Sequence, residues 1–306
     1  MVMAAGDIAC SASDANFNGG AGGTSSCREM AVSGLALGAV VDAVLPLGDL
    51  QYDCGETADW QASYDKSWGR LLSVSHPAIG NHEYGRACGR NDATPYFDYF
   101  GARAGADQHG WYSYDLGTWH LIALNSECKY GTGAGQVGGC GPGSPQMTWL
   151  QNDLATHPTQ CTLAYWHEPR FSSGEHGDAQ QMTDIWNVLV QAKADIVLSG
   201  HNHDYERFDP AGVTPVDPNA DPAGSTTGTP SFQDPVLDPT GIRSWVVGTG
   251  GKNHYGFTAP ALQGEVVRNS DTFGALKLTL HDGSYDWEFV PEPGKTFTDS
   301  GTGLCH

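Results

Sequence analysis

Metal-capable side chains follow short apolar runs at four separated places in this chain. Each run passes through glycine just before the polar residues, and the four segments are Val2–Asp7, Val41–Tyr52, Val74–Glu83 and Ile196–His203. Glycine has no Cβ, so the chain can turn sharply at the end of a buried strand and project the next side chain from the carboxyl edge of a sheet. Four such strand ends lying side by side would form one site.

The side chains expected at this edge carry oxygen and nitrogen donors. They are Asp7, Asp49, Tyr52, Asn81, His201 and His203, and a fifth predicted strand, CTLAYWH, adds His167. A single Gly-Asp pair is more often a turn than a ligand. The recurrence of such pieces at successive predicted strand ends, with two histidines in GHNH, favours a metal site. Seven donors are enough for two metal ions rather than one.

The elements that must position these residues alternate between strands and helices. Near-continuous apolar runs predict strands that are covered on both faces: Val40–Leu47, Val74–Ile79, His120–Asn125, Thr162–Trp166 and Asp195–Leu198. Helices are expected from Thr24 or Ser25 to Leu37, over Ala58–Leu72, in SPQMTWLQNDLATH with Ser144 as its cap and Pro145 in its first turn, and over Ala179–Ala194.

The C-terminal part of the chain has a different pattern. SWVVGTGG, ALKLTLH and SYDWEFV alternate or abut as strands of a second, antiparallel-containing sheet would. We therefore predict an α/β fold, a four-layer α/β/β/α sandwich of two mixed β-sheets flanked by helices. The candidate ligands run from Asp7 to His203, so a single domain over 1–306 is expected. Residues 209–241 are rich in Pro, Gly, Asp and Thr and predict a long surface insertion at the rim of the site.

Charge and hydropathy exclude several kinds of partner. The 306 residues include 35 Asp and Glu against 15 Lys and Arg, a net charge of −20, which disfavours nucleic acid and anionic membranes as partners. No stretch reaches the roughly 18 apolar residues of a membrane span. The chain opens on a strand-like MVMAAGD without a charged leader, so we expect a mature form whose signal peptide has been removed.

The eight cysteines include no CxxC pair, which favours disulfides over a zinc or redox motif. Disulfides imply an oxidising compartment, so a secreted or extracytoplasmic protein is expected. Pairing neighbours in sequence would join Cys10 with Cys27, Cys54 with Cys88, Cys128 with Cys140 and Cys161 with Cys305.

The ordered motifs GDIA, GDLQY, GNHE, AYWH and GHNHDYER resemble those of the calcineurin-like metallophosphoesterases, specifically the purple acid phosphatase branch. Most members carry a histidine where this chain has Ala9, and the tyrosine of GDxxY is the signature of the purple branch. The resemblance implies two metal ions bridged by Asp49. It places Fe(III) at Asp7, Asp49, Tyr52 and His203, and Zn, Mn or Fe(II) at Asp49, Asn81, His167 and His201.

The same resemblance implies a phosphatase that hydrolyses small phosphate monoesters. Two ions about 3.5–4 Å apart can lower the pKa of a shared water, and the resulting hydroxide would attack phosphorus in line. A histidine can protonate the leaving alkoxide near neutral pH. His82 and His176 are the candidates for this role, and with Asn81 they are expected to contact the substrate. Two alternatives remain: a phosphodiesterase with the same metal core, and a non-catalytic metal- or phosphate-binding protein.

Overall fold

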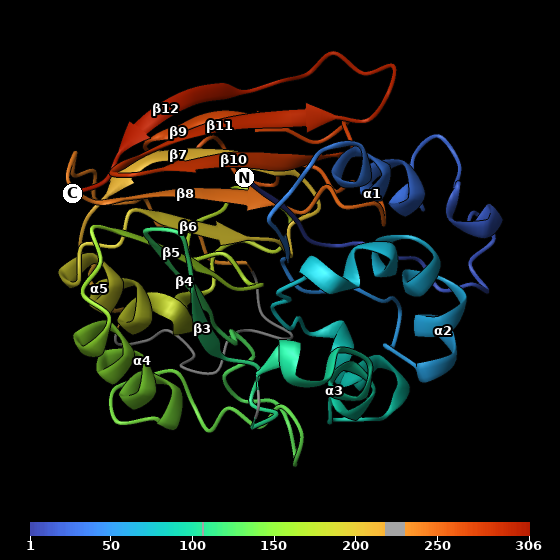
Figure 1. The fold of residues 1–306 in the computed structure, drawn as a ribbon, viewed down its shortest axis with the longest axis horizontal. Helices are drawn as coiled ribbons and strands as arrows, with labels where there is room; N and C mark the ends of the chain where they lie inside the picture. The colour runs from blue at the N-terminus through green and yellow to red at the C-terminus, as the bar shows by residue number, and fades with distance from the viewer. Residues whose placement is uncertain (106, 218–229) are drawn as a thin grey trace.

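The computed structural model describes residues 1–105, 107–217 and 230–306, and within them the chain forms two mixed β-sheets (Figure 1). The five-stranded sheet has the order β12 (Ser300–Leu304), β11 (Ser284–Pro291), β10 (Gly274–His281), β1 (Val2–Ala5) and β2 (Ala43–Pro46). The seven-stranded sheet has the order β3 (Tyr112–Leu116), β4 (Trp119–Ala123), β5 (Cys161–Tyr165), β6 (Ile196–Ser199), β8 (Ile242–Val247), β7 (Tyr205–Ala211) and β9 (Glu265–Asn269).

Parallel pairing is concentrated in the strands that lead to the predicted site. β1 pairs in parallel with β2, and β4, β5, β6 and β8 form a parallel series, while the flanking strands are antiparallel. Parallel strands all deliver their carboxyl ends to the same edge of a sheet. The chain therefore brings the residues that follow β1 and β2, and those that follow β5 and β6, to common edges.

Helices cover the outer faces of the two sheets, as the sequence predicts (Figure 1). The principal helices are α1 (Glu29–Gly38), α2 (Thr57–Ala62), α3 (Thr94–Phe100), α4 (Pro145–Thr156) and α5 (Thr183–Gln191). Leu150 of α4 and Trp186 of α5 are buried with Ile122 and Ala164 of the seven-stranded sheet. Val32 of α1 belongs to the larger apolar cluster that includes both sheets. The predicted four-layer arrangement of two mixed sheets flanked by helices is confirmed.

The start of α4 follows the predicted capping pattern. Ser144 has extended dihedral angles, and its Oγ accepts a hydrogen bond from the N–H of Met147 at 3.3 Å. Pro145 occupies the first helical position, where a missing N–H has no consequence because that group would have no intrahelical partner.

Several predicted elements differ from the structure. Val74–Ile79 is not a strand, because Pro77 has no N–H to donate, and only isolated bridges join this extended segment to the residues of β2 and its end. The first helix begins at Glu29 rather than near Thr24, since Cys27 has a left-handed φ of 59° that a helix does not accept.

The predicted helix over Ala58–Leu72 is broken after α2. Short 3₁₀ turns follow at Tyr64–Lys66 and Trp68–Val74, and the N–H of Tyr64 donates to Oε1 of Gln51 at 3.1 Å instead of to a helical carbonyl. The tail segment SWVVGTGG forms β8, which pairs with β6 in the seven-stranded sheet, not with β10 and β11. Alternation of apolar residues predicts a strand, but it does not specify the neighbour of that strand.

All four expected disulfides are present in the structure, and they include every cysteine of the chain. Their Cα atoms lie 5.2 to 6.1 Å apart. Cys10–Cys27 fastens the loop that follows β1. Cys54–Cys88 joins the loop after Tyr52 to the loop after His82. Each bridge is expected to contribute about 2–4 kcal/mol to the free energy of unfolding.

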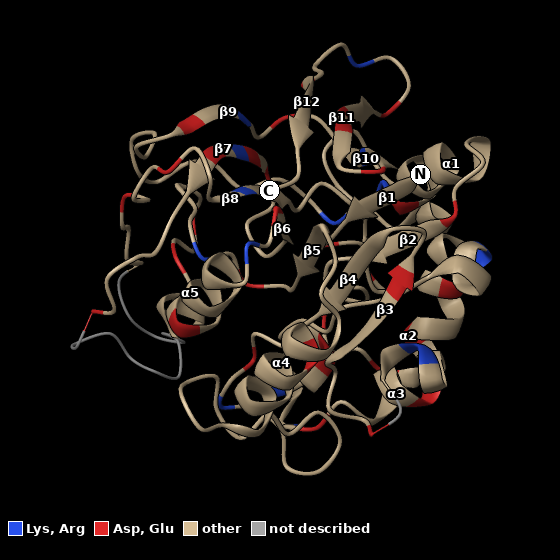
Figure 2. Ribbon diagram, turned by 60° about the vertical axis from the view of Figure 1, so that its left-hand side comes forward, with Lys and Arg blue, Asp and Glu red and all other residues tan. Residues whose placement is uncertain are grey.

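Asp and Glu residues are spread over helices, strands and loops rather than gathered on one element (Figure 2). Glu29, at the start of α1, is one of several acids that are fully buried. Its Oε1 lies 3.4 Å from Ser63 Oγ, and its Oε2 has no hydrogen-bond partner among the described residues. Burial raises the pKa of Glu29 from 4.5 to about 8. The folded protein therefore holds a proton that the unfolded chain releases above pH 4.5, so stability falls as the pH rises toward 8.

We expect the substitution Glu29→Gln to stabilise the protein at pH 7.5 by about 2 kcal/mol and to have little effect at pH 4.5. Denaturant unfolding of variant and wild type at both pH values measures the difference. Glu288→Gln, at a half-exposed position paired with Lys277, is the control and should show no such pH dependence. Equal stability of Glu29→Gln and wild type at pH 7.5 would contradict the prediction.

Candidate metal centre

The structure brings all seven predicted donor residues together where the two sheets meet. Four of them form one group around the Tyr52 hydroxyl. Tyr52 Oη lies 2.9 Å from Asp7 Oδ1, 3.1 Å from Asp49 Oδ2 and 2.9 Å from His203 Nε2. His203 Nε2 is also 3.2 Å from Asp7 Oδ1. These are the residues at which the family resemblance places the first ion.

The second group adjoins the first and shares Asp49 with it. His167 Nε2 lies 3.2 Å from Asp49 Oδ2, 3.2 Å from Asn81 Oδ1 and 3.2 Å from His201 Nδ1. The donor atoms of Asp49, His167 and His201 all lie within 4.8 Å of one another. Asp49 therefore has the position expected of a residue that bridges two ions.

The sequence predicts that the strand ends carrying these residues lie side by side. In the structure they belong to two different sheets. Asp7 and Asp49 follow β1 and β2 of the five-stranded sheet, whereas His167 and His201 follow β5 and β6 of the seven-stranded sheet. The site is therefore built between the edges of two sheets. Asn81 reaches it from the extended segment beside β2.

Glycines allow these backbones to approach closely. A Cβ at Gly48, where φ is 84°, would lie 2.5 Å from His167 Nδ1, and one at Gly200 would lie 2.7 Å from Asp7 Oδ2. Asp7, Asp49 and His201 themselves have φ of 59°, 49° and 70°, a left-handed conformation that is uncommon outside glycine. Such strain at three donor residues is typical of a functional site.

A buried glutamate holds two of the site loops in register. Glu83 accepts hydrogen bonds from the N–H groups of Gly80 at 2.8 Å, Asp49 at 2.9 Å and Leu50 at 2.9 Å. Asp49 Oδ1 in turn accepts from the N–H of His82 at 2.8 Å. The backbone that carries Asp49 and the backbone that carries Asn81 and His82 are thus fixed by a single carboxylate and its neighbours.

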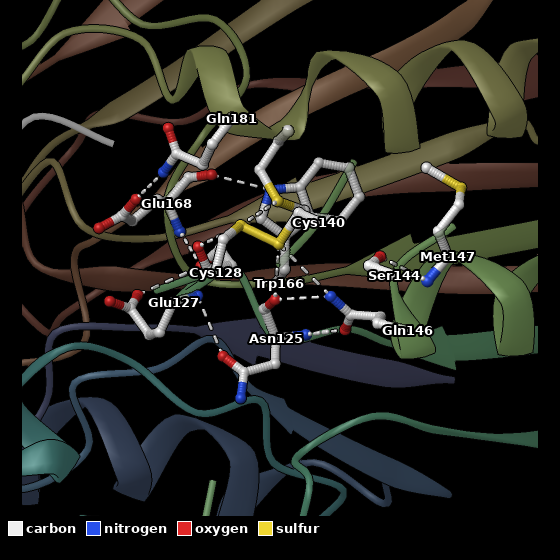
Figure 3. The surroundings of a disulfide bond; sticks show 12 residues. Asn125, Glu127, Cys128, Cys140, Ser144, Gln146, Met147, Trp166, Glu168 and Gln181 are labelled. Carbon is white, nitrogen blue, oxygen red and sulfur yellow. Dashed lines mark hydrogen bonds between the residues drawn. A yellow bond between two sulfur atoms is a disulfide. The ribbon is translucent and has the colours of Figure 1, made fainter. Parts of the chain in front are cut away.

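A polar network near the Cys128–Cys140 disulfide contacts Trp166 and Glu168, the residues on either side of His167 (Figure 3). The N–H of Glu168 donates to Ser126 Oγ at 3.0 Å, and Trp166 Nε1 donates to the carbonyl of Glu168 at 2.8 Å. Gln146 pairs with both backbone groups of Asn125, at 2.7 and 2.9 Å. The Cys128–Cys140 disulfide closes the loop that follows Asn125 and Ser126, so it helps to fix the surface against which the His167 segment packs.

The electrostatics of these side chains favour positive charge at the centre. His167 Nδ1 lies 2.9 Å from the carbonyl oxygen of Leu47, so this nitrogen donates and Nε2 is the nitrogen that faces the centre. Burial alone would lower the pKa of His167, but the charge of the Asp49 carboxylate, 3.2 Å from Nε2, raises it well above its ordinary value. Burial raises the pKa of Tyr52, and the charges of Asp49 and Asp7 raise it further. Metal ions would supply the positive charge that these carboxylates favour, and carboxylate, phenolate and imidazole are suitable donors for them.

The two predicted proton donors lie beside the donor groups. His82 is partly exposed, its ring centre is 4.2 Å from that of Tyr52, and its Nε2 is 3.7 Å from Asp49 Oδ2. His176 is exposed, and its ring centre is 4.6 Å from that of His201. The N–H of His176 donates to Asn202 Oδ1 at 2.7 Å, which fixes the backbone of its loop.

Two further acidic residues near the histidines contact other groups. Glu206 accepts from the N–H of Ser173 at 2.8 Å and from Ser172 Oγ, so it orders the loop before His176. Asp53 forms an ion pair with Lys252 at 3.2 Å, and only its backbone carbonyl contacts His82.

Two further residues border the centre. Tyr255 stacks on His203 with ring centres 3.9 Å apart. Lys252 was not foreseen: its Nζ lies 5.0 Å from the centre of the Tyr52 ring. The sequence gives one signal for this contact. The run GTGG directly precedes Lys252, so Lys252 follows a glycine near a strand end, as most of the donor residues do.

Comparisons with known proteins agree with this geometry. The family described as calcineurin-like phosphoesterase matches residues 17–205. Purple acid phosphatase 21 of Arabidopsis thaliana is 29% identical over 201 residues, which cover 60% of this chain and 41% of that protein. Phosphoenolpyruvate phosphatase of Allium cepa is 27% identical over 191 residues, covering 54% of this chain and 36% of that protein. The matches thus span about two fifths of the length of these relatives.

Solved structures show the same fold at lower identity. A purple acid phosphatase from yellow lupin seeds superposes with a TM-score of 0.67 at 19% identity, covering 98% of this chain and 53% of that one. GAP50, described as the anchor in the inner membrane complex of Plasmodium, superposes with a TM-score of 0.61 at 12% identity, covering 99% of this chain and 88% of that one. At these identities the likeness concerns the fold alone.

Proposed function

Because this chain belongs to the calcineurin-like phosphoesterase family and is similar to purple acid phosphatases, we propose that it hydrolyses phosphate monoesters at a centre of two metal ions. The observation that carries the proposal is the convergence of seven donor residues into two groups that share Asp49. In this proposal Fe(III) is held by Asp7, Asp49, Tyr52 and His203. Zn, Mn or Fe(II) is held by Asp49, Asn81, His167 and His201.

When bound, two metal ions would activate a water molecule near neutral pH and would neutralise negative charge on the phosphate oxygens. The protein must then position the ester and provide a proton to its leaving group. His82 and His176 reach the centre from opposite groups, one beside Tyr52 and the other beside His201. In our proposal Asn81 and His82 orient the phosphate, and His176 or His82 donates the proton to the departing alkoxide.

The wider properties of the protein follow the same proposal. Four disulfides support an oxidising, extracytoplasmic location. In the described part of the chain, none of the helices has both the length and the apolar character needed to cross a bilayer. The net charge of −20 favours small phosphate esters over nucleic acids as partners. We propose that residues 1–306 form one domain around the centre. Within the predicted 209–241 insertion, β7 extends to Ala211, and 218–229 lie outside the described residues.

Relative rates on a monoester and a diester test the proposed substrate class. We expect kcat/KM for p-nitrophenyl phosphate to exceed that for bis(p-nitrophenyl) phosphate by at least about 10-fold, or 1.4 kcal/mol in the transition state. Two metal cations with nearby histidines compensate a dianion better than a monoanion that carries a second bulky arm. Steady-state kinetics at several pH values measure the ratio. The reverse ranking would favour a phosphodiesterase. Tight metal binding without hydrolysis of either ester would favour a binding protein, since a fold alone does not establish catalysis.

A further inference from the structure

A polar cleft of about 460 Å³ lies beside the metal centre, between the loop that follows β1 and the loop that follows β8. It is lined by Asp14, Asn16, Ser25, Ser26, Lys252 and Asn253, together with the ring of His254. No aliphatic or carbocyclic aromatic side chain is among these lining residues. The cleft is separate from the seven donor residues and has no role in the mechanism described above.

Short contacts fix the position of this cleft relative to the centre. The N–H of Lys252 donates to the carbonyl of Asp7 at 3.0 Å, and the ring of His254 bonds to the carbonyl of His203 through Nδ1 at 3.0 Å. Lys252 Nζ lies 5.0 Å from the centre of the Tyr52 ring. Residues on one wall of the cleft therefore rest directly on three residues of the proposed ferric site. The cleft therefore adjoins that site through Lys252 and His254.

The two walls are also fastened to each other. The N–H of Cys27 donates to the carbonyl of Lys252 at 2.9 Å, and Ser26 and Asn253 form an antiparallel bridge. The Cys10–Cys27 disulfide ties the first wall to the end of β1. The cleft is thus a fixed feature of the fold, although both of its walls are loops.

The charges in the cleft disfavour an anionic ligand. Lys252 Nζ is paired with Asp14 at 3.3 Å and with Asp53 at 3.2 Å, so two carboxylates surround one ammonium. The Asp53 side chain is 64% exposed, and an ion pair with so exposed a partner is weak. Lys252 can therefore exchange Asp53 for a ligand oxygen with little loss of interaction free energy. The other amides, hydroxyls and carboxylate of the lining offer both hydrogen-bond donors and acceptors.

We propose that this cleft binds the leaving group of the phosphate ester and that it takes a polyhydroxylated group such as a sugar. A neutral ring with several hydroxyls satisfies a lining of alternating donors and acceptors, whereas an apolar ring would leave those groups unpaired. A nucleobase would find no Phe, Tyr or Trp side chain in this lining on which to stack, and the one imidazole, that of His254, already packs against Phe273 with ring centres 4.0 Å apart. This inference rests on the proposed function, because it assigns the alcohol part of the proposed monoester substrate.

Two esters of equal shape test the inference. Glucose 6-phosphate and cyclohexylmethyl phosphate both carry a six-membered ring on a CH₂–O–P linkage, but only the first has ring hydroxyls. We expect the wild-type protein with its metals to favour glucose 6-phosphate by at least about 10-fold in kcat/KM, since one hydrogen bond is worth roughly fivefold. Asn253→Ala should reduce this ratio by about fivefold, and Ser26→Ala should reduce it in the same direction.

The control is Asn152→Ala, which removes an exposed asparagine from α4, and it should leave the ratio unchanged. A wild-type ratio of kcat/KM between the two esters near one overturns the inference. The inference is also overturned if neither Asn253→Ala nor Ser26→Ala changes that ratio. In either case both esters are still hydrolysed, so the phosphatase proposal stands. If the metal-loaded wild type hydrolyses neither ester nor p-nitrophenyl phosphate, the proposed function fails and the inference fails with it.

Discussion

Replacing Asp49 with asparagine should lower kcat/KM for p-nitrophenyl phosphate by about 10⁴-fold and remove most of the bound metal. Asp49 is 2% exposed and is the one donor residue shared by both groups, with Oδ2 at 3.1 Å from Tyr52 Oη and 3.2 Å from His167 Nε2. Asparagine has the same shape but no charge, and its side-chain oxygen can still accept the N–H of His82 that Asp49 accepts at 2.8 Å. The fold should therefore survive while the bridge between the ions is lost.

Metal analysis, kinetics and thermal unfolding of the Asp49→Asn variant test this expectation together. The control is Asp286→Asn, at an exposed position paired with His281, and it should keep wild-type activity and metal content. If Asp49→Asn retains two ions per chain and hydrolyses the ester at a rate within 10-fold of wild type, Asp49 does not bridge the centre.

The second large effect concerns two neighbouring histidines with different roles. The ring centres of His176 and His201 are 4.6 Å apart, yet only His201 contacts another donor residue, with Nδ1 at 3.2 Å from His167 Nε2. We expect His201→Ala to lose one of the two ions and several orders of magnitude in kcat. His176→Ala should keep both ions, and its kcat for an alkyl phosphate should fall by roughly 10²–10⁴-fold, because the substitution removes only a proton donor.

The dependence on leaving group separates these roles further. A p-nitrophenolate departs without strong need of a proton, whereas an alkoxide requires one, so His176→Ala should slow an alkyl phosphate more than p-nitrophenyl phosphate. His201→Ala should slow both to a similar degree. Equal losses for both esters in His176→Ala would transfer the role of proton donor to His82, and loss of an ion from that variant would make His176 a ligand.

Much of the site can be predicted because its sequence signals lie within short segments of the chain. A glycine that ends a buried strand and a polar residue that follows it are recognisable in the sequence. The six donor residues chosen in this way converge in the structure with His167, which ends the predicted strand CTLAYWH. Parallel strands such as β1 and β2 deliver their ends to one edge, so their neighbours in space need not be known. The capped start of α4 is local in the same sense, since Ser144 and Pro145 carry its entire signal.

The features that escaped prediction depend on contacts between distant parts of the chain. Pairing of β8 with β6, rather than with the other tail strands, is a choice of neighbour that alternation does not encode. The break after α2 depends on Gln51, which binds the N–H of Tyr64. Lys252 reaches Tyr52 only because the loop after β8 folds back on Asp7. Each of these outcomes is fixed by tertiary packing and not by propensity.

Metal analysis of the natively purified protein, combined with its visible spectrum, tests the central claim most directly. We expect about two metal ions per chain, at least one of them iron. We also expect a visible absorption band that colours the protein violet to pink, from the Tyr52 phenolate on Fe(III). Tyr52→Phe should abolish that absorption, because Tyr52 Oη is the only phenolic oxygen that contacts Asp7, Asp49 and His203 among the described residues. One ion per chain, zinc without iron in protein made with iron available, or colour that survives Tyr52→Phe would contradict the account.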